Sequence, residues 1–118
     1  MQCRHVGAII KLAVLAAVAL GLAPMPVNAQ EVVTLQISIK NHRFQPSELK
    51  APANSPVTLA VRNLDPTPEE FESRTLRVEK VVAGNSEITI QLRPLSPGRY
   101  RFYGDFNQAT AQGALIAE

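Results

Sequence analysis

Short runs of alternating apolar and polar residues constrain the fold of this chain more than any other feature of its sequence. In VVTLQISIK (32–40), four apolar side chains alternate with polar ones, which is the period of a strand with one buried face. The pattern returns in PVTLAVRN (56–63), SEITIQL (86–92) and GRYRFYG (98–104), with turn-forming residues between the runs. We therefore predict an all-β fold, an antiparallel Greek-key β-sandwich.

The first 29 residues have the pattern of a secretory leader. Two basic residues precede or border an apolar run at 12–22, and Val27 and Ala29 are small residues placed for cleavage. We predict a cleavable signal peptide over 1–29 and an exported, periplasmic domain over 30–118. The alternative is a membrane anchor, but the run falls short of the ~20 apolar residues that span a bilayer. We expect no membrane span after cleavage.

Charge and cysteine content argue against two classes of function, nucleic-acid binding and catalysis. Of twelve basic residues, Arg4 and Lys11 belong to the leader, so ten remain against ten acidic residues. A near-neutral domain without a basic patch is not expected to bind nucleic acid. The one cysteine, Cys3, also lies in the leader, and Ser73 and Ser86 have no histidine close in sequence. We predict a domain held by its core alone, and no enzymatic activity.

Two aromatic residues are expected to be structural. In LSPGRY (95–100), the proline and glycine favour a sharp bend, and the Tyr100 hydroxyl is placed to reach the backbone near Ser96. This arrangement is a tyrosine corner, which is typical of sandwich folds. Phe44 lies between His42 and Pro46 and is expected to anchor the core.

Two long segments carry a family resemblance. ISIKNHRFQPSELKAPANSPVTLAVRNLDPTPEEF (37–71) and LSPGRYRFYGDFNQATAQGALIAE (95–118) resemble the cupredoxins, the small copper-carrying sandwich proteins. They are most similar to the cupredoxin-like domain of the EfeO type, found in exported components of bacterial iron-uptake systems. EEFES and PGRYRFYGDF are the more specific parts. The resemblance implies a role in iron transport, with a membrane iron permease, a ferrous oxidase system or another periplasmic iron-uptake protein as partner.

The resemblance also shows which copper ligands are absent. A blue-copper site uses two imidazoles, a thiolate and a weak axial ligand. Gly104 stands where the cysteine would be, Asn107 where the second histidine would be, and Ala111 near the axial methionine. Glu70 is nearest to the first histidine. We therefore do not expect type 1 copper in this chain.

Carboxylates are the metal-binding side chains that the chain does offer. Glu69, Glu70 and Glu72 lie within four residues, and Asp105 is expected in the facing loop. Oxygen donors suit Fe(III), Mn(II) or Ca(II) better than copper, and the resemblance favours iron. These four residues, with His42 as a fifth candidate, are our predicted metal ligands. The alternative is that the acidic run is a solvated loop without a ligand.

Two further positions bear on this site. Similar sequences tend to have histidine where Arg74 and Asn107 stand, and Arg74 could pair with the glutamates in a bidentate fork.

The sequence leads to two functional hypotheses. The first is an exported accessory protein of iron transport that binds iron or another hard cation. The second is a metal-free sandwich whose acidic run docks to a permease or another periplasmic partner.

Overall fold

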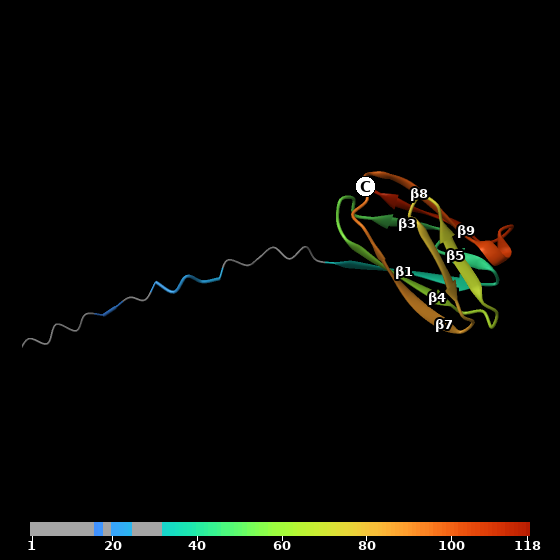
Figure 1. Cartoon of the computed structure of the whole chain (residues 1–118), viewed down its shortest axis with the longest axis horizontal. Coiled ribbons are helices and arrows are strands. Elements are labelled where there is room, and N and C mark those ends of the chain that lie inside the picture. The colour runs from blue at the N-terminus through green and yellow to red at the C-terminus, as the bar shows by residue number, and fades with distance from the viewer. Residues whose placement is uncertain (1–15, 18–19, 25–31) are drawn as a thin grey trace, which may run out of the picture.

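The chain folds into two facing β-sheets (Figure 1). The computed structural model describes residues 16–17, 20–24 and 32–118, so most of the predicted signal peptide lies outside the described residues and stays a prediction. No helix in these described ranges is long and apolar enough to cross a membrane. The elements are β1 (Val33–Lys40), β2 (Arg43–Gln45), β3 (Glu48–Ala51), β4 (Val57–Asn63), β5 (Glu69–Ser73), β6 (Val78–Val82), β7 (Ser86–Leu92), β8 (Gly98–Gly104), the 3-10 turn η1 (Asp105–Asn107) and β9 (Gln112–Ala117).

The predicted all-β sandwich is confirmed, and β1, β4, β7 and β8 coincide with the four alternating runs. One sheet has the order β2-β1-β4-β7 and the other β3-β9-β8-β5-β6. The pairing is mixed rather than wholly antiparallel, because β1 pairs with β4 and β3 with β9 in parallel. Between β1 and β4 the chain crosses to the other sheet to form β3, and it returns to lie beside β1 in the same direction.

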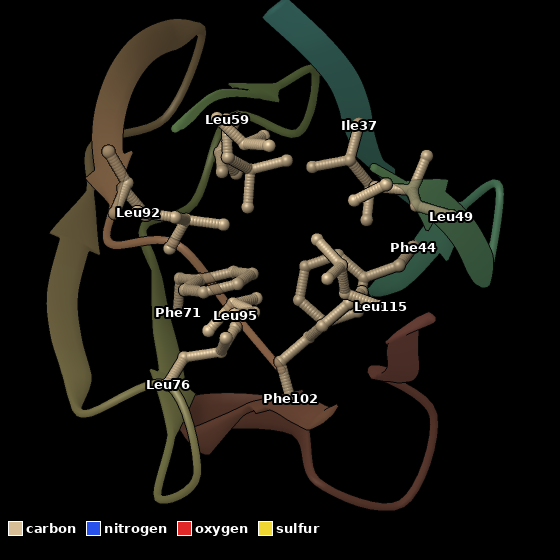
Figure 2. Packing of buried hydrophobic residues seen from close by; sticks show 14 of the residues in the cluster. Ile37, Phe44, Leu49, Leu59, Phe71, Leu76, Leu92, Leu95, Phe102 and Leu115 are labelled. Atoms are coloured by element: carbon tan, nitrogen blue, oxygen red, sulfur yellow. The ribbon is translucent and has the colours of Figure 1, made fainter. Parts of the chain in front are cut away.

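Three phenylalanine rings join the two sheets at the centre of the core (Figure 2). Phe44 of β2 meets Phe71 and Phe102 edge to face, with ring centroids 5.9 and 5.0 Å apart. Phe71 of β5 and Phe102 of β8 stack at 5.0 Å. Such pairs add about 0.5–1.5 kcal/mol each beyond the burial of their area. The prediction that Phe44 anchors the core is confirmed, since this residue is only 4% exposed.

The tyrosine corner is present as predicted. The Tyr100 hydroxyl donates a hydrogen bond of 2.8 Å to the Ser96 carbonyl oxygen. The bond fastens the start of β8 to the bend before it, although its atoms are accessible to water. Its contribution to stability is therefore that of an ordinary, solvent-accessible hydrogen bond.

We expect Tyr100→Phe to lower the free energy of unfolding by about 1 kcal/mol, because water replaces part of the lost interaction. Phe102→Ala should lower it by roughly 3–5 kcal/mol, because it removes a ring from the centre of the core. Urea unfolding followed by circular dichroism measures both. An unchanged midpoint for Tyr100→Phe would show that the corner adds nothing to stability.

Candidate functional site

The acidic run EEFES is a strand, β5, and the expectation that it forms a loop is wrong. Glu69, Phe71 and Ser73 are buried, whereas Glu70 and Glu72 are partly exposed. The reason is the two-residue period of a strand, in which successive side chains point to opposite faces. Glu69 therefore faces the interior, and the other two glutamates face outward.

The outward carboxylates gather with a third one from the neighbouring strand. Glu70, Glu72 and Glu79 each offer an oxygen atom, and these atoms lie within 4.8 Å of one another. Glu79 of β6 stands directly opposite Glu72 in the β5–β6 register. Glu79 is absent from the predicted ligands because it comes next to Glu72 only when EEFES is paired as a strand. The available signal was a hairpin, in which the four residues 74–77 connect two short strands.

The three-glutamate cluster consists of Glu70, Glu72 and Glu79. Its carboxylates repel one another unless a proton or a cation reduces their negative charge. The pKa of Glu70 is raised, chiefly by hydrogen bonding with the Glu79 side chain, then by partial burial and by repulsion from Glu79, Asp105 and Glu72. Two carboxyl groups can share a hydrogen bond only when one is protonated. Asp105 is close enough to add to the negative potential, so the structure brings together Glu70, Glu72 and Asp105 of the predicted ligands.

A groove of about 710 Å³ runs beside the cluster. The groove is lined by acidic, basic and neutral polar side chains, among them Glu72, Arg74, Glu79, Arg101, Tyr103 and Asp105. Among the described residues the ion pairs are His42–Asp65, Lys50–Glu118 and Arg99–Glu48, so Arg74 does not form the expected fork with the glutamates. Arg74 instead lies beside the Tyr103 hydroxyl. The pKa of this hydroxyl is raised, first by burial and then by Glu72, whereas Arg74 acts to lower it. Within the described part of the chain, the carboxylates of Glu70, Glu72 and Glu79 thus have no ion pair with a guanidinium.

His42 belongs to a different local structure. Its backbone N–H and that of Asn41 donate to the two carboxylate oxygens of Asp65, at 2.9 and 2.8 Å. The His42 hydrogen bond is the main reason why the pKa of Asp65 is lowered. The His42 imidazole Nδ1 lies 3.7 Å from the same carboxylate. His42 is therefore placed with Asp65, and it is not a member of the three-glutamate cluster.

Glu69 is the inward-facing member of the acidic run and is only 1% exposed. Its Oε1 accepts hydrogen bonds from the backbone N–H groups of Glu70 and Phe106, at 3.0 and 2.9 Å. Its Oε2 accepts one from the Asn107 side-chain amide at 2.7 Å. Three donors thus compensate the buried charge. The carboxylate is committed to hydrogen bonds within the protein.

A family model described as the cupredoxin-like domain matches residues 10–117. The chain belongs to the cupredoxin-like family. A relative, the uncharacterized protein RP394 of Rickettsia prowazekii (strain Madrid E), is 44% identical over 85 residues, which are 72% of this chain and 68% of that protein. The cupredoxin resemblance inferred from the sequence is confirmed.

Solved structures agree on this cupredoxin-like fold. Auracyanin A, a "blue" copper protein of Chloroflexus aurantiacus, has a TM-score of 0.64 at 14% identity and covers 75% of this chain and 100% of its own. The metal-binding domain of the Streptococcus pneumoniae D39 Cu(I)-exporting P-type ATPase CopA has a TM-score of 0.61 at 15% identity, with coverages of 75% and 96%. The purple cupredoxin of Nitrosopumilus maritimus scores 0.54 at 18% identity, with coverages of 70% and 98%. At such identities the likeness shows the fold alone.

The cupredoxin-like centre of this chain does not fit a blue-copper site. Gly104 and Ala111 offer no donor atom, and Asn107 directs its amide N–H toward Glu69. Glu70, expected nearest to the first histidine, faces outward, and Glu69 faces the centre in its place. A blue-copper site requires imidazole and thiolate donors. Among the described residues, positions 104, 107 and 111 therefore do not supply the side-chain donors of a type 1 copper site.

The raised pKa of Glu70 predicts a pH-dependent effect of Glu70→Gln. A carboxyl group with a raised folded-state pKa adds stability below its unfolded pKa, and this stability is lost as pH rises through the folded pKa. The glutamine amide has no proton to lose in this pH range, so the variant keeps this stability as pH rises. In metal-free buffer we therefore expect the urea midpoint of Glu70→Gln to exceed that of the wild type at pH 7 and to approach it at pH 4.

Glu87→Gln is the matched control, because Glu87 lies on β7 in the other sheet, opposite Arg62. Its midpoint should not rise above that of the wild type at pH 7. A Glu70→Gln variant that is less stable than the wild type at pH 7 would contradict the repulsion among the three carboxylates.

Proposed function

We propose that this protein is an exported, cupredoxin-like accessory protein of bacterial iron transport that binds a hard cation. The binding residues are Glu70, Glu72 and Glu79, and Asp105 adds negative potential. The observation that carries the proposal is the approach of three carboxylate oxygens to within 4.8 Å of one another. The resemblance to the EfeO type supports iron as the cation, and the leader-like residues 1–29 support export to the periplasm.

The geometry favours a cation for two reasons. First, the hairpin of β5 and β6 holds the carboxylates on one face through its backbone pairing, so little ordering is needed when an ion binds. Second, a cation relieves the repulsion that raises the pKa of Glu70. Oxygen-only donors suit Fe(III), Mn(II) and Ca(II), and water completes the coordination of a site on a sheet surface. Non-enzymatic cation carriage is the activity such a site supports.

Equilibrium dialysis of residues 30–118 against Fe(III), Fe(II), Mn(II), Ca(II) and Cu(II) tests the proposal. We expect a hard cation to bind with 1:1 stoichiometry. Glu70→Gln with Glu72→Gln should weaken binding roughly tenfold or more, because amides keep the shape but lose the charge. Glu48→Gln with Glu87→Gln removes the same charge away from the cluster and should leave affinity nearly unchanged.

A second candidate function is docking to a protein partner. Phe106 in η1 is 50% exposed and follows Asp105, and Val81 of β6 is 56% exposed and stands opposite Glu70 in the β5–β6 register. Contiguous exposed apolar surface with a polar rim marks docking sites, and these two side chains would contribute to such a surface. If none of the five ions bound at millimolar concentration, the cation proposal would fail and docking to a permease or another periplasmic partner would take its place.

A further inference from the structure

The interior end of β5 contains a charge that the proposed cation site does not use. This charge is the buried Glu69 carboxylate, which lies among the positions that the resemblance assigns to copper ligands. We propose that Glu69 is an internal replacement for the metal ion, and that its carboxylate joins β5 to η1 in the way a bound ion would join its ligands.

The chain positions that would carry ligands surround this one carboxylate. A Cβ atom on Gly104 would lie 2.6 Å from Glu69 Cδ and 2.7 Å from the Ala111 Cβ atom. The Asn107 amide nitrogen lies 2.7 Å from Glu69 Oε2. Positions 104, 107 and 111 therefore converge on a single point, and the Glu69 carboxylate fills it. Gly104 is the residue that leaves room for this carboxylate, because any larger side chain would collide with it.

The polarity of the centre is the reverse of a metal site. A metal centre directs lone pairs inward at a cation. Here the backbone N–H groups of Glu70 and Phe106 and the side-chain N–H of Asn107 point inward at an anion. Convergent N–H groups favour negative charge and disfavour a cation. No buried side-chain polar atom in the described part of the chain lacks a hydrogen-bond partner, so no such atom is left over to bind an ion.

The carboxylate also explains how the segment after β8 keeps its shape without a metal. Backbone hydrogen bonds close this segment on itself, from Gly104 N–H to the Ala111 oxygen and from Ala111 N–H to the Asn107 oxygen, both at 2.8 Å. The bonds from Phe106 and Asn107 to Glu69 then fasten it to β5. Loss of this carboxylate should loosen η1 and leave the distant parts of both sheets intact.

Amide hydrogen exchange measured by NMR tests the proposal. Glu69→Ala should speed exchange at the Phe106 N–H at least roughly tenfold and lower the urea midpoint, because buried donors lose their acceptor. Glu87→Ala, on β7 in the other sheet, should leave Phe106 exchange unchanged. If Glu69→Ala does not fold, Glu69→Gln keeps one oxygen for the backbone donors, so Phe106 should stay protected while the Asn107 side-chain amide signals shift. Unchanged Phe106 exchange in Glu69→Ala, or unchanged Asn107 signals in Glu69→Gln, would overturn the proposal.

A Zn(II) titration tests the reversed polarity separately from the proposed cation site. The titration uses protein with Glu70→Gln and Glu72→Gln, which removes two of the three charges of the three-glutamate cluster. Its outcome therefore does not depend on whether that cluster binds iron. We expect millimolar Zn(II) to leave the Phe106 and Asn107 signals in place and the urea midpoint unchanged. Zn(II)-dependent shifts of both signals with a higher midpoint would show that the centre still accepts a cation, and would overturn the replacement of the ion by Glu69.

Discussion

The burial of Phe71 is the packing constraint on which the rest of the structure depends. Its ring meets Phe44 from the opposite sheet and Phe102 from its own, so it couples the two layers of the sandwich. It also fixes the phase of β5, because a slip of one residue would turn every side chain of the strand to the other face. A slip would bury Glu70 and Glu72 and expose Glu69. The position of one aromatic ring thus decides which glutamates face solvent.

Neighbouring glutamates on this strand consequently have opposite electrostatic environments. Glu69 is surrounded by N–H donors and keeps a compensated charge in the interior. Glu70 is accessible to water but faces Glu79, Glu72 and Asp105, and the pKa of its carboxyl group is raised. A buried carboxylate needs hydrogen-bond donors, and Glu69 has them on both of its oxygens. Hydrogen-bond donors therefore surround the Glu69 carboxylate, and acidic groups surround that of Glu70.

The sequence predicts those parts of the fold that depend on local alternation. The strands β1, β4, β7 and β8, the core position of Phe44 and the Tyr100 hydrogen bond all follow from residues close together in the chain. The features that it does not predict depend on pairing between distant segments. Glu79 joins the cluster only through the β5–β6 register, and the parallel pairings require the crossing between sheets. The role of Glu69 depends on donors 37 and 38 residues away.

The parallel pairing of β3 with β9 has a consequence for the order of folding. β3 ends at Ala51, and its partner positions lie at 114–117, on a strand that also separates β3 from β8 within the sheet. The five-stranded layer therefore cannot close until β9 is available, although β1 and β4 can pair much earlier in synthesis. Contacts of such sequence separation slow folding and leave strand edges exposed meanwhile. The four-stranded sheet would form first, and β9 would complete the five-stranded sheet last by inserting between β3 and β8.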